Sequence, residues 1–215
     1  MMRKLSFLFF GLILFAFACK KEEVKPTAEI PAPEDSVQTE KIIELKTSFG
    51  TMYMWLYKET PLHRNNFLKL AAEGFYNDVT FHRIIKDFMI QGGDPNSKDG
   101  DPTNDGTGGP GYTIPAEIKS NIKHTYGSIG AARTNNPEKA SSGSQFYIVT
   151  NRNGTPHLDN NYTVFGKLLS GVDSAYTIST QSKDVKDRPL VDIKMQVKVV
   201  EKTLEQLKTE FNFTP

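Results

Sequence analysis

Two segments of the chain carry side chains whose types and spacing could perform chemistry. The first spans residues 81–94 and reads FHRIIKDFMIQGGD. The second spans residues 143–148, reads GSQFYI, and is followed by Leu158-Asp159 and by VFGK at 164–167. These segments are the candidates for a functional site.

The first segment places one cation, two apolar side chains and one amide on neighbouring strand-like runs. If those runs pair, the four side chains can converge. They belong to Arg83, Phe88, Met89 and Gln91. The alternative is that Phe88 and Met89 are core residues and Arg83 is a surface charge. For an isolated segment that alternative is favoured, because apolar strand residues are mostly buried.

Other kinds of site find little support in the composition. Lys plus Arg number 26 and Asp plus Glu number 25, so a net charge of +1 gives no general attraction to nucleic acid. The single cysteine and the histidine spacing favour no metal site, so we expect no metal and no cofactor. A hydrolase based on Ser144 ranks far lower, since GSQF is not GxSxG. The glycine-rich stretch 92–111 lacks the Gly-Lys-Ser/Thr of a phosphate loop.

The elements around these segments are predicted to be short strands with few helices. Alternation of apolar and aromatic residues over 51–57 predicts one strand of a hairpin. Thr60 and Pro61 offer the N-cap and first position of a helix that ends near Gly74. The other expected strands are 42–47, 79–85, 88–91, 128–132, 146–150, 163–167 and 194–201, with short helices at 171–179 and 204–211. This pattern favours a sandwich or a closed barrel.

The N-terminus has the features of an export signal. Arg3 and Lys4 precede an apolar run over 5–18, which is shorter than the roughly 18 residues of a membrane-spanning helix. The run ends in Ala16-Phe17-Ala18-Cys19, which resembles a bacterial lipobox, although leucine is usual where Ala16 stands. We therefore expect lipidation of Cys19. The alternative is an ordinary signal peptide cleaved after Ala18.

The residues after Cys19 predict a tether. They are rich in proline, glutamate and lysine and have almost no large apolar side chains, so they cannot form a core. We expect a signal peptide over 1–18, the lipidated cysteine and a disordered tether over 19–41, a folded domain over 42–202 and a tail over 203–215. The domain would lie in the periplasm or at the surface of a bacterial cell, anchored to a membrane.

Taken together, the segments resemble the cyclophilin family from about Ile42 to about Lys202. The strings FHR, FMIQGGD and GSQF stand in the family's order and spacing. The resemblance implies an all-β fold, an eight-stranded antiparallel closed barrel with two capping helices and an active groove on its outside. It also implies peptidyl-prolyl cis/trans isomerase activity on proline-containing polypeptides, without a cofactor.

The resemblance further implies roles for single residues. Arg83 stands at the catalytic arginine, with Phe88 and Met89 at the floor of the proline pocket. Gln91 stands at the amide that holds the substrate backbone. The other implied substrate-binding positions are Ala132, Arg133, Gln145, Tyr147, His157, Leu158 and Tyr162.

Four of these positions depart from the common family pattern. Arg133 replaces an asparagine whose backbone binds substrate, and Tyr147 replaces phenylalanine, which adds a hydroxyl to an apolar wall. His157 stands where many members have tryptophan, and Tyr162 where eukaryotic members usually have histidine. The side-chain change at Arg133 should be tolerated, and at His157 and Tyr162 we expect a change of ligand preference, including that for cyclosporin, more than of activity.

One alternative keeps the fold and removes the catalysis. The chain could be a non-catalytic proline-binding module or a chaperone. The presence of Arg83 beside an intact pocket argues against that function. The sequence points to no obligate partner, so we expect a monomer that binds proline-containing polypeptides and touches the membrane only through its anchor.

Overall fold

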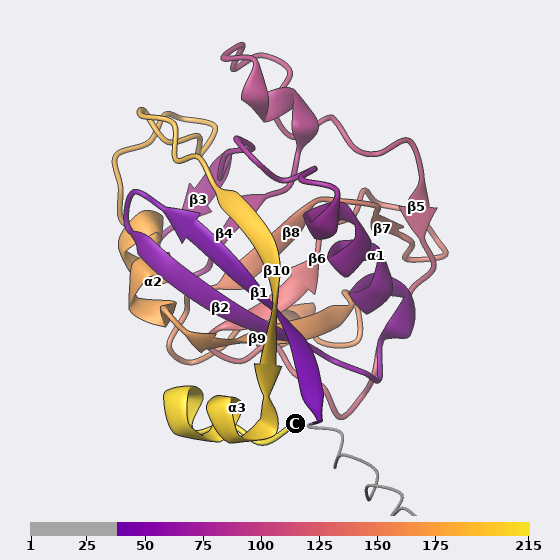
Figure 1. The fold of residues 1–215 in the computed structure, drawn as a ribbon. Helices are drawn as coiled ribbons and strands as arrows, with labels where there is room; N and C mark the ends of the chain where they lie inside the picture. The colour runs from indigo at the N-terminus through magenta and orange to yellow at the C-terminus, as the bar shows by residue number, and fades with distance from the viewer. Residues whose placement is uncertain (1–37) are drawn as a thin grey trace, which may run out of the picture. The chain divides into compact units, whose positions relative to one another are not determined.

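The described part of the protein is an antiparallel sheet with helices at its margins. A computed structural model describes residues 38–215, so the signal, Cys19 and most of the expected tether lie outside the described residues. Eight strands follow the order β10-β1-β2-β9-β6-β8-β4-β3, and every pair is antiparallel (Figure 1). Their bounds are β1 Thr39–Thr47, β2 Gly50–Leu56, β3 Arg83–Ile85, β4 Met89–Gly92, β6 Ser128–Ala131, β8 Phe146–Val149, β9 Val164–Ser170 and β10 Gln196–Thr203.

The hairpin expected near the start of the domain is confirmed. β1 and β2 pair from Thr47 opposite Gly50, and Gly50 has φ +125°, a backbone conformation that favours glycine. β1 begins at Thr39, which pairs with Thr203 of β10. β1 thus begins three residues before the expected domain boundary at residue 42.

The two ends of the sheet meet without forming a continuous ladder. The N–H of Asp78 donates to the carbonyl of Met195 at 2.9 Å, and that of Phe81 donates to Ile193 at 3.0 Å. An isolated antiparallel bridge joins Thr80 and Lys194 between them. These segments precede β3 and β10, so the paired strands themselves form an open series. Of the expected closed barrel, residues 38–215 show an eight-stranded antiparallel sheet whose two ends are joined by these hydrogen bonds and this bridge.

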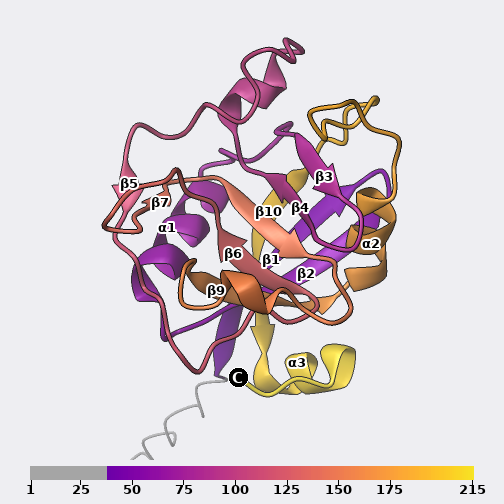
Figure 2. The ribbon, with the colours of Figure 1, turned by 180° about the vertical axis from the view of Figure 1, so that it is seen from behind.

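Three α-helices accompany the sheet where two capping helices were expected. α1 (Pro61–Ala72) and α2 (Val172–Ser179) lie at opposite margins of the curved sheet in both views (Figures 1 and 2). α3 (Leu204–Phe211) directly follows β10 and has the bounds predicted for a C-terminal helix. Short elements that the sequence did not predict are the 3-10 helices η1 (Pro95–Lys98) and η2 (Pro156–Leu158) and the paired strands β5 (Thr113–Ile114) and β7 (Ser141–Ser142).

α3 makes the expected tail a part of the fold. Thr203 caps it with a capping box, in which its hydroxyl accepts from the N–H of Gln206 and its own N–H donates to the Gln206 side chain. Leu207 is fully buried and packs with Ile42 and Trp55 on the face of the sheet opposite the main core.

The main core lies inside the curved sheet and is rich in aromatic rings. Phe67 of α1 stacks on Tyr76 at 4.6 Å between ring centroids and meets Phe146 of β8 edge-on at 5.3 Å. Ile90 and Ile148, which pair across β4 and β8, are fully buried in the same cluster. Because strand residues alternate between faces, their sequence neighbours must point away from this core.

Candidate active site

A cavity of about 130 Å³ lies on the outer face of β3, β4 and β8. Met89 and Gln91 flank the core residue Ile90, and Tyr147 precedes the core residue Ile148. The alternation that buries the isoleucines therefore turns these three side chains outward. Nine residues line the cavity, namely Arg83, Phe88, Met89, Gln91, Ala132, Arg133, Tyr147, Leu158 and Tyr162.

The floor and walls of the cavity form an apolar cluster separate from the main core. Met89 and Tyr147 are buried, and Phe88, Leu158 and Tyr162 are partly buried against them. Phe88 therefore does not belong to the main core. The structure confirms that the first segment brings the two apolar residues, the cation and the amide together.

A polar chain forms the opposite side of the cavity. The Gln91 amide nitrogen donates to the Gln145 side-chain oxygen at 3.0 Å. Gln145 in turn donates to the carbonyl oxygens of Gly106 and Gly108 at 3.0 and 2.8 Å. The Gln91 oxygen is left facing Arg83, whose Nη1 lies 3.4 Å away. Gln145 thus orients Gln91, and it also lines a second hollow that shares Gln91, Ala132 and Arg133 with the cavity.

The glycine-rich stretch is ordered by a buried aspartate at its start. Asp94 is fully buried, and its two carboxylate oxygens accept from the N–H groups of Asn96 at 2.8 Å and Gly108 at 3.0 Å. The stretch thereby presents the two glycine carbonyls that hold Gln145. Its role is structural support of the site.

Arg83 is supported by a loop that the sequence analysis did not assign to the site. The Arg83 Nε atom lies 3.8 Å from a carboxylate oxygen of Asp187, and the Arg83 side chain is 42% exposed. The Asp187 carbonyl accepts from the N–H of Ile84 at 2.8 Å. Lys183 donates both to the Asp187 carboxylate at 2.7 Å and to the Ile84 carbonyl at 3.1 Å. The loop is therefore fixed to β3 at the residue after Arg83.

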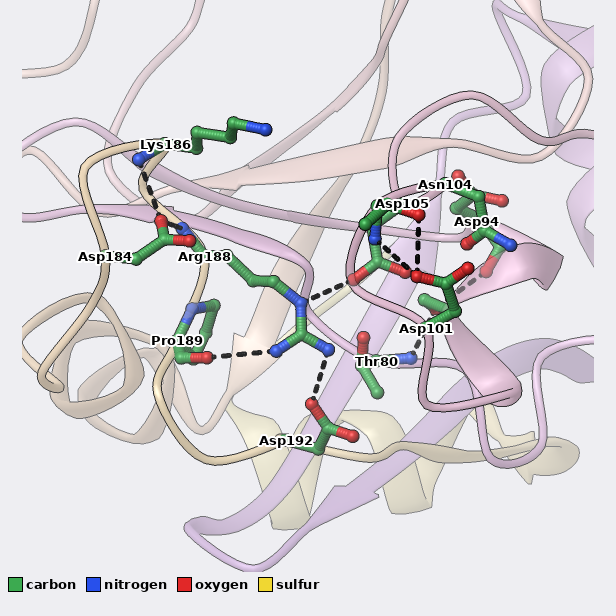
Figure 3. Close-up of polar contacts among 12 residues, drawn as sticks. Thr80, Asp94, Asp101, Asn104, Asp105, Asp184, Lys186, Arg188, Pro189 and Asp192 are labelled. Atoms are coloured by element: carbon green, nitrogen blue, oxygen red, sulfur yellow. Dashed lines mark hydrogen bonds and ion pairs between the residues drawn. The ribbon is translucent and has the colours of Figure 1, made fainter.

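Arg188 fixes the same loop from its other side (Figure 3). Its Nε donates to Asp105 at 2.7 Å and its Nη2 to Asp192 at 2.8 Å. The side chain of Asp184 accepts from the N–H groups of Lys186 and Arg188. Arg188 therefore joins the loop to the glycine-rich stretch that contains Asp105.

Tyr147 differs from the expectation that its hydroxyl would add polarity to the pocket wall. The hydroxyl lies 2.8 Å from Nε2 of His124, a buried residue. The Tyr147 ring remains part of the apolar wall. Burial raises the pKa of the Tyr147 hydroxyl, so it stays protonated at neutral pH.

Arg133 and Tyr162 form one rim of the cavity. The Arg133 guanidinium carbon lies 4.7 Å from the centroid of the Tyr162 ring, a cation–π geometry. Its Nε donates to the Asn161 carbonyl at 3.0 Å. The backbone N–H of the neighbouring Ala132 donates to the Gln145 carbonyl at 3.0 Å and is therefore not available to a substrate.

His157 lies beside the cavity and does not line it. The residue is exposed on η2, and its ring stacks on Phe88 with 5.6 Å between centroids. His157 therefore extends the apolar floor outward, where a ligand longer than one residue would meet it.

Two residues at the site were missed by sequence reasoning, namely His124 and Asp187. Both lie far along the chain from their partners and outside the two chosen segments. Asp159 stands directly after Leu158, which was the one available signal that a polar group supports this wall. Among residues 38–215, no cluster of His, Cys, Asp and Glu side chains is arranged to hold a metal ion, and no helix is long and apolar enough to cross a bilayer.

The comparison with protein families agrees with this geometry. The family model described as "Cyclophilin type peptidyl-prolyl cis-trans isomerase/CLD" matches residues 42–199. The chain is 36% identical over 165 residues to peptidyl-prolyl cis-trans isomerase CYP18-2 of Arabidopsis thaliana, covering 74% of this chain and 93% of that protein. It is 46% identical over 114 residues to peptidyl-prolyl cis-trans isomerase B of Bacillus subtilis, covering 53% of this chain and 72% of that protein.

Other relatives match over different shares of their length. The chain is 40% identical over 156 residues to peptidyl-prolyl cis-trans isomerase-like 2 of Rhizopus delemar, covering 70% of this chain and 27% of that larger protein. Among solved structures, a Cryptosporidium parvum cyclophilin-type isomerase crystallised with the dipeptide Ala-Pro matches with a TM-score of 0.66 and 29% identity. That match covers 75% of this chain and 99% of the other.

The segments that the comparisons match contain the strands that build the outer cavity, its apolar floor and its arginine. The chain belongs to the cyclophilin family and is a cyclophilin-type peptidyl-prolyl cis-trans isomerase.

Proposed function

We propose that this isomerase acts on X-Pro bonds of exported proteins, with Arg83 as its catalytic residue and a lipid on Cys19 as its anchor. The observation that carries the catalytic part is the position of the Arg83 guanidinium at the edge of an apolar cavity, 3.4 Å from the side-chain oxygen of Gln91. Such a site suits a reaction in which no covalent bond is made or broken.

The chemistry required is a rotation about one amide bond. The barrier of about 18–20 kcal/mol comes from the partial double bond between carbon and nitrogen. In the twisted transition state the proline nitrogen becomes pyramidal and gains a lone pair. Arg83 can donate a hydrogen bond to that lone pair and cannot do so in the planar ground state, so its interaction is stronger in the transition state. Arginine suits this role because its guanidinium stays charged.

The remaining residues of the cavity hold the substrate on either side of the rotating bond. Phe88, Met89 and Leu158 receive the proline ring. Gln91, oriented by Gln145, offers an amide to the substrate backbone. One part of the peptide is thereby held while the other turns.

The first test separates an isomerase from a non-catalytic proline-binding module. Cis/trans exchange of a short Ala-Pro peptide is measured by NMR exchange spectroscopy with catalytic amounts of the full chain. We expect exchange much faster than uncatalysed isomerisation, which takes tens to hundreds of seconds. Peptide binding without faster exchange would instead identify the binding module.

The exported location is supported by the sequence of the N-terminus. The charged start, the apolar run over 5–18 and the lone cysteine after it are the features of a lipoprotein signal. A diacylated cysteine supplies two acyl chains, enough for stable anchoring, whereas one chain gives only marginal binding. Substrates would then be proteins that fold in the same compartment.

Cys19→Ala tests the anchor. We expect the wild-type protein to begin at Cys19, to carry lipid mass on its N-terminal peptide and to sediment with membranes. The variant should remain an uncleaved precursor or be released as a soluble form. Membrane fractionation that Cys19→Ala leaves unchanged, together with an N-terminal peptide free of lipid, would disprove the anchor and leave the isomerase assignment standing.

A further inference from the structure

The back of the pocket wall is attached to a buried hydrogen-bonded group that the reaction described above does not use. The group consists of the Tyr147 hydroxyl, the His124 ring and the Asp159 carboxylate. His124 Nε2 lies 2.8 Å from the Tyr147 oxygen, and His124 Nδ1 lies 2.8 Å from Asp159 Oδ1. The rings of Tyr147 and His124 are nearly parallel, with 10° between their planes.

The direction of these hydrogen bonds follows from the chemistry of the carboxylate. Burial alone would raise the pKa of Asp159, but hydrogen bonds from the backbone N–H and the ring of His124 outweigh burial and lower it. An ionised carboxylate only accepts, so Nδ1 must carry the hydrogen of the neutral ring. Nε2 is then an acceptor, and the Tyr147 hydroxyl donates to it. Both ring nitrogens and the Tyr147 hydroxyl then have a partner of the right kind, and Asp159 Oδ2 lies 3.7 Å from Lys123 Nζ.

The group connects two walls of the proline pocket. Tyr147 belongs to β8, whereas Asp159 directly follows Leu158, the pocket residue on η2. The His124 carbonyl accepts from the N–H of Thr155 at 2.8 Å, which fixes the start of η2 to the same segment. A shift of His124 would therefore move the Tyr147 wall and the Leu158 wall relative to each other.

The Tyr147 ring has little room to take another position. A Cβ placed on Gly130, which pairs with Tyr147 on the neighbouring strand, would lie 2.2 Å from the tyrosine Cζ atom. Tyr147 is 5% exposed and His124 2% exposed. The glycine admits the ring on one side, and His124 holds its hydroxyl at the end.

We propose that His124 and Asp159 are positioning residues that fix the spacing between the Tyr147 and Leu158 walls, and that the Tyr147 hydroxyl is their point of attachment. The inference rests on the proline pocket of the proposed function. It assigns a role in substrate affinity to three polar groups that do not touch the rotating bond.

The expected kinetic signature differs from that of Arg83. The walls contact the proline ring equally in the ground state and in the transition state. Loosening them should therefore weaken peptide binding and leave kcat nearly unchanged. Loss of one net hydrogen bond corresponds to a roughly three- to tenfold rise in Kd.

The experiment measures Kd for an Ala-Pro peptide by NMR titration and kcat by exchange spectroscopy, using the full chain. Tyr147→Phe and Asp159→Ala should each raise Kd by the factor given above with kcat changed less than about twofold. The Kd of the double variant should not exceed that of the weaker-binding single variant, because both substitutions break the same connection between the two walls. Asp159→Asn should restore binding, since its amide oxygen can accept from both His124 groups as Asp159 Oδ1 does.

Tyr53→Phe is the matched control. It removes a tyrosine hydroxyl that donates to Glu44 at 2.9 Å on β2, away from the pocket. Kd and kcat should both stay at their wild-type values. The ¹⁵N spectrum of the imidazoles gives a measure that does not depend on activity. It should show His124 protonated on Nδ1, with an Nε2 signal that shifts in Tyr147→Phe.

Several results would overturn the proposal. They are a His124 ring protonated on Nε2, single variants that bind as the wild type does, effects that multiply in the double variant, and a loss that appears in kcat alone. If Asp159→Ala fails to fold, the nearly isosteric Tyr147→Phe decides by itself. If the wild type binds the peptide without speeding exchange, the proposed isomerase function fails, while Kd and the imidazole spectrum still decide this inference.

Discussion

The two arginines at the cavity are held in different ways, and the difference bears on which can act on substrate. The Arg133 guanidinium lies over the Tyr162 ring and donates to two backbone carbonyls, those of Asn161 and Thr134. Arg83 has a longer contact to Gln91 at 3.4 Å and an ion pair with Asp187 at 3.8 Å. The Arg133 guanidinium is thus held in place at the edge of the cavity, whereas Arg83 keeps N–H donors available for a substrate.

At His157 we expect weak inhibition by cyclosporin. The tryptophan common at this position in the family donates its indole N–H to the drug, and the exposed imidazole stacked on Phe88 has a smaller ring and a different donor geometry. Loss of that bond costs about 1–3 kcal/mol, or roughly ten- to hundredfold in affinity.

The measurement compares inhibition of wild type and His157→Trp in one isomerase assay. His157→Trp should bind the drug more tightly and keep its activity, because His157 does not line the cavity. Tight inhibition of the wild type, or no gain with tryptophan, would show that this position does not set the affinity.

At the scale of elements, the loop over 182–192 supports the site although it lies outside the FHR, FMIQGGD and GSQF strings. It is fixed to β3 through Lys183 and Asp187, and to the glycine-rich stretch through Arg188 and Asp105 (Figure 3). Asp187 has φ +69°, uncommon for a residue other than glycine, so the loop conformation depends on these contacts.

Arg188→Ala should therefore lower both stability and turnover. The substitution leaves the Asp105 carboxylate, 6% exposed, without its cation. Loss of a hydrogen bond to a charged group costs about 1.5–3 kcal/mol of unfolding free energy. Release of Asp187 should also lower kcat through Arg83.

Urea denaturation and exchange spectroscopy measure the two effects, with Lys186→Ala as a control because its side chain is exposed on the same loop. A folded Arg188→Ala protein with wild-type kcat would show that the loop does not support Arg83.

The sequence predicted the elements whose pattern is local and missed those that depend on distant partners. The hairpin, the helix after Thr60 and the helix over 204–211 follow from local patterns, although the Thr60 side chain makes no capping hydrogen bond and donates to the Tyr57 carbonyl instead. The pairs β5 with β7 and Thr80 with Lys194 are too short to leave a periodic pattern. Nine of the eleven expected site positions line the cavity, but the resemblance did not show that Gln145 lines the adjoining hollow or that His157 lies beside the cavity.

At the scale of the whole molecule, burial of histidines makes stability depend on pH. Desolvation lowers the pKa of His63, His82 and His124, and for His63 and His124 a neighbouring carboxylate opposes that shift only in part. The folded state therefore prefers the neutral rings, while the unfolded chain takes up protons near a pKa of about 6.5.

Stability should accordingly be full above pH 6.5 or so and fall as the pH decreases below that value. Each ring contributes at most about 1.4 kcal/mol per pH unit. Carboxylates with lowered pKa, such as Asp159, add to the loss at more acidic pH. Urea midpoints at neutral and mildly acidic pH provide the measurement. A midpoint that rises or stays constant on acidification from neutral pH would contradict this account.

In the proposed mechanism, Arg83 accelerates rotation by donating a hydrogen bond to the pyramidal proline nitrogen. Removing a transition-state donor of this kind costs about 2.7–4 kcal/mol, or roughly 10²–10³ in rate. Arg83→Ala should therefore lower kcat by that factor in exchange spectroscopy with an Ala-Pro peptide, while Kd changes little and circular dichroism stays that of the wild type. A folded Arg83→Ala protein with wild-type turnover would contradict the account.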